Sequence, residues 1–497
     1  MKKLHLSLVA AAACLLTTSV SADDAKPKRE LKNNMMVITN TTPAAVDNIA
    51  DAFTEGTFYG RLRMNSFKWD WKDVDQDNKA FGIGGSMTYK TAPFAGVSAT
   101  AGLYYSNSPF SSLRQDNADI GETKAGKDTF SRYNVARTGD WSMATLAEAY
   151  IQYDISKTTF KAGRQIFESF LTKSNDTKMI PNTFMGYVVE TKELPDTTLR
   201  GAYFTEQKLR DHTTFHDVIT FGTEMDNTND GNWNNNDDSA VHKGLSYANL
   251  KNAGADTNND LIVVDARNKS IPNLQIDLTY GAVPDLISNF TAELNYKIAL
   301  GNKLSLTPGV RHMQQFDNGA GEIGGATLKG GLAGQTGAVD GYKDASSLDS
   351  SLTMARLVLT DGVFKAQVAY SAVADEGDIV APWRGFPTGG YTRAMAQYNW
   401  YANTKTTAAE LHYNFGKAGL VPGFQAMVRY AMQDFDEAKQ DAGVQADSNI
   451  LHIDLNQRVT DGLYAKLRVG LVDADDRVGS TDKDSYNEYR FELNYLF

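Results

Sequence analysis

The sequence is short of three features that would define its class at once. It has one cysteine among 497 residues, which excludes a disulfide scaffold and a cysteine-based zinc site. It has no basic surplus: 49 Lys and Arg stand against 60 Asp and Glu, a net charge of −11, which argues against a nucleic-acid binder. After the N-terminal segment it has no apolar run of the ~18 residues that a membrane-spanning helix needs, so we expect no helical membrane protein. What remains is a 42% hydrophobic, 22% charged composition that resembles an ordinary soluble protein.

The N-terminal segment has the three zones of an export signal. It begins with Lys2 and Lys3, continues with an apolar core over 6–16, and ends in small residues at Ala22. The core is too short to anchor the chain in a membrane, and the small residues suit a signal peptidase. The alternative is a lipoprotein signal at the single cysteine, although the apolar stretch before that cysteine is short for such a signal. We therefore predict a cleaved signal peptide over 1–22 and a cysteine-free exported protein.

Period-two alternation dominates the chain from Gly56 onward. Segment 489–497 is apolar at every odd position, and 463–471 repeats this with Lys466 and Arg468 on the other face. Each such run is close to the ~9–11 residues of a tilted transmembrane strand, and about twenty runs qualify. Further runs cover 58–64, 364–370 and 407–415 or start near Phe81, Val97, Ala147, Leu274, Ala292 and Phe424.

Alternation alone also fits a soluble β-sandwich, so other features decide between the two folds. Long charged side chains occupy the polar faces, as a wet lumen requires. Aromatic residues gather at strand ends, for example Trp400, Tyr401 and Tyr495, which is typical of interfacial girdles. The chain also stops on an aromatic residue, Phe497, at the end of an alternating strand. These features favour an all-β transmembrane antiparallel barrel.

The connections alternate in length along the expected barrel. Tight turns carry Asp-Gly at 361–362 and 461–462, where a positive φ is needed. Long polar stretches lie between the turns, and this asymmetry predicts short periplasmic turns and long extracellular loops. We expect three parts: the signal peptide, an N-terminal tail over 23–55 with a short helix, and a single barrel over 56–497. The long stretches are 107–145, 206–243, 317–350, 372–393 and 434–448.

Three apparent sites are better explained as loop sequence. Residues 121–127 have the glycine spacing of a phosphate-binding loop, but Asp128 follows where Ser or Thr is required. The Asn/Asp run 226–238 lacks the ordered ligand spacing of an EF-hand. His212 and His216 lie four apart in a polar loop without a nearby nucleophile. We therefore expect no enzyme activity, no cofactor and no metal site.

At this point the sequence resembles a known family, the OprD-like outer-membrane porins. Residues 51–63 resemble the first strand of that family, and 161–165 with 175–186 are similar to a strand and its inward loop. Residues 202–206 resemble the next element, and 382–385 (Pro-Trp-Arg-Gly) resemble the related major outer-membrane porins of Gram-negative bacteria. The similarity spans essentially the whole mature chain. It implies a barrel of about 18 strands, a narrowed eyelet, a lumen-facing row of basic residues and often a homotrimer.

The candidate pore residues combine this resemblance with the phase of the alternation. Lys466 and Arg468 face the lumen by phase and also match the family's basic row. Two residues of the inward loop and two of the second loop are candidates for the eyelet. Arg164 is a weaker eyelet candidate, because its phase matches the lipid-facing Phe160. The candidates for the row are Lys466, Arg468, Arg429, Arg61, Arg63 and Arg311, and those for the eyelet are Asp176, Lys178, Arg384, Arg393 and Arg164.

The sequence therefore predicts a porin in the bacterial outer membrane, in contact with lipid. It would pass small polar, anionic or zwitterionic solutes through a water-filled lumen, since water and charge inside the barrel lower the barrier for such solutes. An alternative is a structural or adhesive barrel whose long loops bind external ligands. A third hypothesis is a hydrolase embedded in the membrane.

Overall fold

The computed structural model describes most of the expected barrel. The prediction of a signal peptide over 1–22 lies outside the described residues, as do the segments 121–127 and 226–238 and the eyelet candidates Asp176 and Lys178. The described ranges are 29–32, 36–39, 42–72, 77–115, 129–131, 134–135, 138–174, 179–220, 242–331, 339–395, 398–479 and 484–497.

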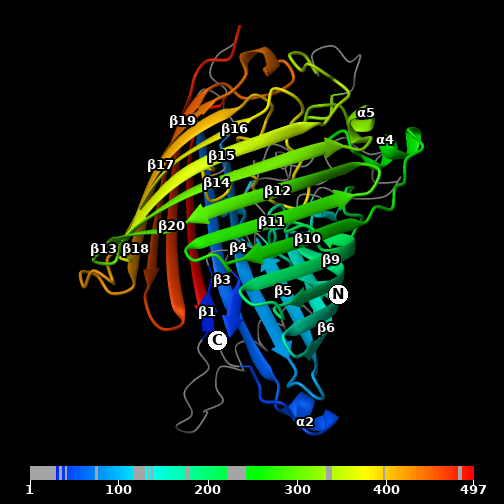
Figure 1. Ribbon diagram of the computed structural model, residues 1–497, viewed down its shortest axis with the longest axis vertical. Helices are drawn as coiled ribbons and strands as arrows, with labels where there is room; N and C mark the ends of the chain where they lie inside the picture. The colour runs from blue at the N-terminus through cyan, green and yellow to red at the C-terminus, as the bar shows by residue number, and fades with distance from the viewer. Residues whose placement is uncertain are drawn as a thin grey trace.

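A closed antiparallel β-barrel forms the body of the molecule (Figure 1). The strands are β3 (Thr57–Trp71), β4 (Asn78–Lys90), β5 (Val97–Asn107), β6 (Ser142–Ile155), β7 (Thr158–Gln165), β8 (Thr183–Thr191), β9 (Thr197–Lys208), β10 (Leu261–Asn268), β11 (Leu274–Val283), β12 (Ile287–Tyr296), β13 (Ile298–Gly301), β14 (Leu304–Asp317), β15 (Ser350–Thr360), β16 (Phe364–Val373), β17 (Lys405–Asn414), β18 (Phe424–Asp434), β19 (Ser448–Arg458), β20 (Leu463–Ala474) and β21 (Tyr486–Leu496).

The last strand closes the barrel by pairing with the first. In this pairing of β21 with β3, Leu493 lies opposite Met64. The segments β12 and β13 both pair with β14 and make one interrupted strand, so the described residues form an 18-stranded barrel. Closure gives every strand two neighbours, which satisfies the backbone hydrogen bonds that an open edge would expose to lipid. The predicted fold class is confirmed.

The alternation read from the sequence corresponds to the two faces of the wall. In β3, Arg61 and Arg63 are 1% and 2% exposed, whereas Leu62 between them is 43% exposed. The same alternation continues around the barrel and leaves large apolar side chains on the outside. Such side chains include Tyr203, Val264, Phe290, Leu294, Val310, Leu357, Val368, Leu411, Val428 and Tyr430. The outer surface is therefore apolar and the inner one polar, as a lipid-embedded barrel requires.

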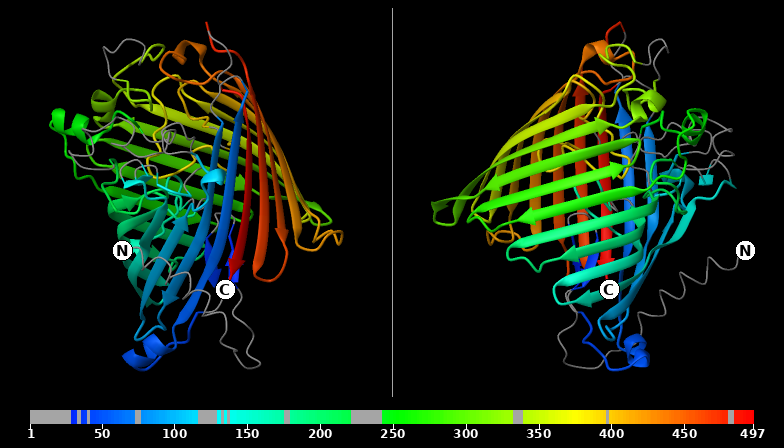
Figure 2. Two further views of the ribbon diagram at one scale, coloured as in Figure 1. Left: turned by 180° about the vertical axis from the view of Figure 1, so that it is seen from behind. Right: turned by 45° about the vertical axis from the view of Figure 1, so that its right-hand side comes forward.

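The two ends of the barrel differ in their connections (Figures 1 and 2). At the turn end, neighbouring strands are joined by short segments such as 156–157, 302–303 and 361–363. At the loop end, long connections predominate, although 284–286 is also short. The helices α4 (Tyr247–Asn252) and α5 (Ala320–Gly324) lie at the loop end, and α2 (Ile49–Thr54) lies at the turn end. The long connections are 108–141, 166–182, 209–260, 318–349 and 374–404.

The turn at Asp361 and Gly362 has the chemistry that its sequence predicts. Gly362 adopts a φ of 92°, in the left-handed region that favours glycine. One carboxylate oxygen of Asp361 accepts hydrogen bonds from the backbone N–H groups of Val363 (2.8 Å) and Phe364 (2.9 Å). Local residues therefore fix the register of β15 against β16.

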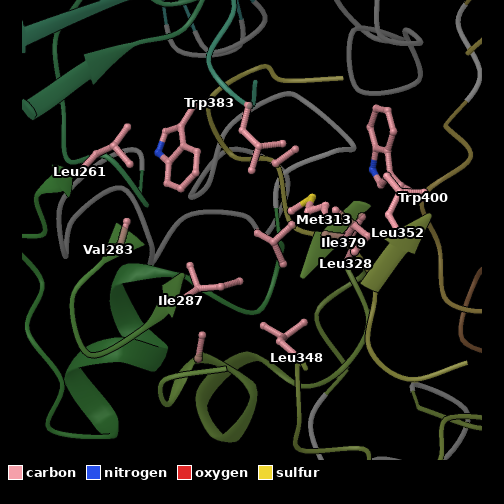
Figure 3. Close-up of a cluster of buried hydrophobic side chains, with 14 of the residues drawn as sticks. Leu261, Val283, Ile287, Met313, Leu328, Leu348, Leu352, Ile379, Trp383 and Trp400 are labelled. Atoms are coloured by element: carbon pink, nitrogen blue, oxygen red, sulfur yellow. The ribbon is translucent and has the colours of Figure 1, made fainter. Parts of the chain in front are cut away.

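The main hydrophobic core lies beneath the loops rather than between two sheets. Figure 3 shows Leu261, Val283 and Ile287 from the strand ends on the side of Trp383, and Met313 and Leu352 on the side of Trp400. Both tryptophans come from the loop 374–404. Trp400 and Tyr401 are 0% and 2% exposed. The expectation that these two residues belong to an interfacial girdle is therefore wrong: they are loop residues that fold back into the barrel mouth, where burial of their rings stabilises the loop.

A buried carboxylate joins two of the long loops. Asp378 accepts hydrogen bonds from the backbone N–H of Leu328 and Ala402, both 2.8 Å, and from the hydroxyl of Tyr342, also 2.8 Å. Burial raises the pKa of Asp378 above its ordinary value, and these donors act in the opposite direction. The contacts tie 318–349 to 374–404, so these long connections are packed structure.

The N-terminal residues form a small hairpin at the turn end. The strands β1 (Arg29–Leu31) and β2 (Val37–Thr39) pair with each other. The guanidinium of Arg29 donates to the carbonyl oxygens of Phe497 (Nε, 3.3 Å) and Phe58 (Nη2, 3.1 Å). These described parts of the expected N-terminal tail are therefore tied to the barrel. No helix among the described residues is long and apolar enough to cross a membrane.

Candidate functional site

The lumen holds a cavity of about 1240 Å³ that extends along the wall from β8 to β21. Side chains from this wall line one side, and the loops 166–174 and 374–404 contribute the other. The lining contains many charged groups of both signs, which no lipid-facing surface would tolerate. The charged residues in the lining are Glu168, Lys173, Glu190, Lys192, Arg200, Arg210, Asp265, Arg267, Asp277, Glu293, Arg311, Arg356, Lys365, Arg393, Arg429, Asp454, Arg468 and Arg490.

Glu293 on β12 is the centre of one charge cluster. Arg311 of β14 donates from Nε to its Oε2 at 2.6 Å, and Arg356 of β15 donates from Nη2 to its Oε1 at 3.1 Å. The hydroxyl of Tyr391, from the loop 374–404, donates to the same Oε1 at 3.2 Å. Three neighbouring strands thus place two cations on one carboxylate, which leaves a local positive excess.

Glu410 on β17 is the central carboxylate of a second charge cluster, as Glu293 is of the first. Its carboxylate pairs with Arg429 of β18 and with Lys365 of β16, whose Nζ lies 2.8 Å from Oε1. His412 also contacts it from the same face of β17. Arg429 lies directly across from Glu410 in the β17–β18 register. The pairing therefore follows from the alternation of both strands.

A third cluster surrounds Asp454 on β19. Its Oδ2 lies 3.2 Å from Nη2 of Arg468 and 3.5 Å from Nζ of Lys466, both on β20. His452 is hydrogen-bonded to Oδ1 at 2.7 Å. The basic residues of the wall therefore do not form a bare cationic row, because carboxylates are interleaved with them.

Two further ion pairs extend this arrangement in both directions around the wall. On one side, Arg63 of β3 lies 2.7 Å from Glu492 of β21. On the other, Arg200 of β9 donates from Nε to Oδ2 of Asp265 on β10 at 3.0 Å. Alternating charges thus follow a broad arc of the lumen, an arrangement that favours groups of both signs over a single one.

The wall arginines also hold a loop across the lumen. Nη1 of Arg311 donates to the carbonyl oxygens of Pro387 and Gly389, both at 3.3 Å. Arg356 donates from Nη1 to the carbonyl of Gly390 at 3.3 Å, and Arg429 donates to the carbonyl of Arg393. The segment 386–393, which we call the constriction segment, is therefore bound to the basic side of the wall through its backbone oxygens.

Arg393 is the charged side chain of the constriction segment itself. Its guanidinium lies over the ring of Phe386 at 3.7 Å and near that of Tyr398 at 5.9 Å from the centroids. All three residues line the cavity. Cation–π contact fixes the orientation of the guanidinium, so its charge is presented to the cavity in a defined place.

The predicted row residues all lie on the lumen side, but in different surroundings. Arg311, Arg429 and Arg468 line the main cavity. Arg61 lines a smaller cavity of about 180 Å³ near the N-terminal hairpin. Lys466 and Arg63 are held in the ion pairs described above.

Two eyelet predictions are corrected by the structure. Arg384 is 1% exposed and paired with Asp211, because its segment packs against another loop rather than facing the cavity. Arg164 keeps the outward phase of Phe160, and its guanidinium lies over the ring of Phe215 at 4.6 Å. Arg164 therefore lies on the face that its phase indicates and does not line the main cavity. Asp176 and Lys178 lie outside the described residues.

Several residues of the wall were missed by the sequence analysis. The carboxylates of Glu293, Glu410 and Asp454 and the cations Arg356 and Lys365 face the lumen by the same alternation as the predicted row. The periodic signal was therefore present, but the resemblance directed attention to basic residues alone. Among the described residues, no group of three or more His, Cys, Asp or Glu side chains is placed to hold a metal ion.

Comparisons with known proteins agree with this architecture. A family model described as "outer membrane porin, OprD family" matches residues 119–497. The comparison with curated proteins finds no match.

Solved structures extend the likeness to nearly the whole chain. Pseudomonas aeruginosa OccK8 (OprE) superposes with a TM-score of 0.65 at 15% identity, covering 91% of this chain and 99% of that one. P. aeruginosa OpdK with vanillate gives 0.63 at 15% identity, covering 89% and 99%. Acinetobacter baumannii OccAB1 gives 0.65 at 16% identity, covering 89% and 96%. At these identities the likeness supports the fold.

Proposed function

Because this chain belongs to the OprD family of outer-membrane porins, we propose that it gives passive passage to small polar solutes that carry a carboxylate, above all zwitterionic ones. The family places the barrel in the bacterial outer membrane, in contact with lipid. The finer proposal concerns what passes, and it depends on the chemistry of the lumen.

One observation carries the proposal: cations and carboxylates are interleaved along the wall of the 1240 Å³ cavity. In the Glu293 cluster two arginines share one carboxylate, and in the Asp454 cluster a lysine and an arginine do so. The cationic excess attracts a solute carboxylate, and the interleaved acids accept an ammonium group. Low-dielectric walls strengthen both interactions relative to bulk water. None of the sites requires the solute to bind tightly, which passage demands.

Arg393 of the constriction segment is the proposed charged group of the eyelet. It faces the cavity from the loop side while Arg311, Arg356 and Arg429 face it from the wall. A solute that passes between them meets cations on two sides. We therefore propose that the eyelet selects for a carboxylate and that the remaining wall orients the rest of the solute.

Planar bilayers and liposome swelling test the proposal with the mature chain. We expect steady ion conductance with a mild anion preference, and faster swelling with zwitterionic amino acids and monocarboxylates than with equally large neutral sugars or diamines. Vanillate belongs in the panel because the similar OpdK structure contains it. Equal swelling rates for solutes of equal size would contradict the charge-based selection. Absence of any steady current would favour the adhesive barrel instead.

Processing and assembly remain predictions with simple tests. Cleavage after Ala22 would give a mature protein that starts at Asp23, which N-terminal sequencing of the outer-membrane form checks. The family resemblance implied a homotrimer, whereas OprD homologues are monomeric, and chemical cross-linking in outer-membrane vesicles distinguishes a single copy from a ladder that ends at three.

A further inference from the structure

The loop 374–404 is held at a second place, just before the constriction segment. Its residues Pro382 to Gly385 pack against the loop 166–174 and against 209–220. Arg384 donates from Nη2 to Oδ1 of Asp211 at 2.8 Å, and both side chains are 1% exposed. A buried ion pair between two loops is costly to break, because loss of either partner leaves the other charge desolvated.

Backbone contacts on the same residues bring a third segment into this junction. Thr172 and Arg384 form an antiparallel bridge, and the N–H of Lys173 donates to the carbonyl of Trp383 at 3.3 Å. A Cβ added at Gly385 would lie 2.1 Å from the carbonyl oxygen of Leu171. The two loops are thus in closest contact at Gly385, where only glycine fits.

Trp383 anchors the same stretch in the core beneath the loops. Its indole Nε1 donates to the carbonyl of Val218 at 3.2 Å, and Gln207 donates to that carbonyl at 2.7 Å. Figure 3 shows the ring near Leu261, at the end of β10. The contact with Val218 therefore packs 209–220 against the loop 374–404.

Arg384 adopts a backbone conformation that is energetically unfavourable for an arginine. Its φ is 61°, in the left-handed region that costs a residue with a Cβ free energy. The surrounding structure must supply that free energy, and the buried pair with Asp211 is one contact that does so. The pair therefore holds the chain in the turn that directs Phe386 and Arg393 into the lumen.

We propose that the Asp211–Arg384 ion pair is a positioning device that sets the width of the eyelet. The wall arginines hold the constriction segment along 387–393, and this pair holds the chain immediately before it, so the point at which the segment enters the lumen is fixed. Neither residue needs to contact the solute. The inference rests on the proposed function, because an eyelet matters only in a conducting barrel.

Two substitutions that disrupt the contact between the loops, and one matched control substitution, test the proposal. Asp211→Asn removes the charge of the pair, and Gly385→Ala separates the loops without touching any charge. The control Asp461→Asn removes the exposed Arg458–Asp461 pair (2.7 Å) at a turn far from the loops. Heat-modifiable mobility on SDS gels establishes that each barrel is folded. In single-channel recordings we expect Asp211→Asn and Gly385→Ala to show higher and noisier conductance and to discriminate less between solutes of different size. We expect no change in the control.

A variant whose link between the loops can be formed and broken reversibly covers the case in which these two substitutions prevent folding. Lys173 donates to Trp383 across the bridge, so Thr172 and Arg384 are a non-hydrogen-bonded pair, whose Cα atoms lie about 4.5 Å apart. That spacing suits a disulfide. Thr172→Cys with Arg384→Cys, in a mature chain without other cysteines, replaces the ion pair by a covalent link. We expect wild-type conductance when it is oxidised and noisy, enlarged conductance when it is reduced.

The outcomes separate this inference from the proposed function. The inference is overturned if the folded Asp211→Asn and Gly385→Ala variants and the reduced double-cysteine variant have the conductance and the solute-size discrimination of the wild type. The pair would then be merely structural. If the wild type itself conducts no ions, the proposed function fails, and the positioning role fails with it.

Discussion

Nη2 of Arg468 lies 3.2 Å from Oδ2 of Asp454, and the two side chains face the lumen from neighbouring strands. The basic row expected from the sequence is therefore interleaved with acids. Its attraction for an anion depends on the local excess of cations, and each carboxylate becomes a determinant of selectivity in its own right.

Selectivity at the Asp454 cluster is expected to change in opposite directions when its two signs are removed. Lys466→Ala combined with Arg468→Ala leaves the carboxylate without these two cations, so the anion-to-cation permeability ratio should fall several-fold. Asp454→Asn should raise the ratio. Reversal potentials in a salt gradient measure both. An unchanged ratio in the double variant would remove these residues from the solute pathway.

Arg311 should have two separable roles, because it contacts both Glu293 and the constriction segment. Arg311→Ala is expected to lower anion preference and also to raise conductance, since the carbonyls of Pro387 and Gly389 lose their donor. Glu293→Gln removes a charge but leaves these loop contacts, so it should raise anion preference at nearly constant conductance. Single-channel recordings that show the same conductance change in both variants would refute the second role.

Acid pH should loosen the segment 209–220. Burial lowers the pKa of His216 to about 4 and that of His212 well below its ordinary value. In an opened segment His216 has its ordinary pKa of 6.5, whereas in the packed segment it stays unprotonated until about pH 4. The contribution of His216 to the packed form is thus fully present above about pH 6.5, and up to ~1.4 kcal/mol of it is lost for each unit of acidification between about pH 6.5 and pH 4.

Hydrogen exchange of backbone amides measures this opening. We expect protection of 209–220 to fall between about pH 6.5 and pH 4, after correction for the intrinsic exchange rate, while strand amides stay protected. His216→Gln should flatten the pH dependence, because the Gln side chain does not titrate. An equally steep loss in that variant would assign the effect to other groups, such as His212 or Asp217.

The N-terminal hairpin should narrow the turn end of the lumen. Residues 36–38 line the smaller cavity together with Tyr59 and Arg61, and Arg29 ties the hairpin to the barrel. Arg29→Ala is expected to increase conductance and its fluctuations, because the hairpin loses its link to the carbonyls of Phe58 and Phe497. Lys32→Ala, a change of the same charge beside β1, is the control. Identical recordings for the two variants would refute a role for this link.

The sequence by itself determined the wall of this barrel. Side chains alternate across a strand with a period of two, so segments such as 463–471 and 489–497 specify which side chains meet lipid and which meet water. Turn chemistry is also local, as Asp361 and Gly362 illustrate. Strand locations and the inward phase of Arg429 or Glu410 could therefore be read from neighbours a few residues apart.

Only the tertiary structure decided how the loops fill the mouth. Arg384 pairs with Asp211 across 173 positions of sequence, and Trp400, which local pattern assigned to a girdle, is buried in a core made of several loops. The same holds for the partners of the basic row, since Arg63 meets Glu492 only because the last strand closes on the first. Contacts between distant segments depend on barrel closure and on packing against non-neighbouring residues, and no periodicity encodes them. The local sequence pattern therefore determines the barrel wall, whereas contacts between distant segments determine the eyelet.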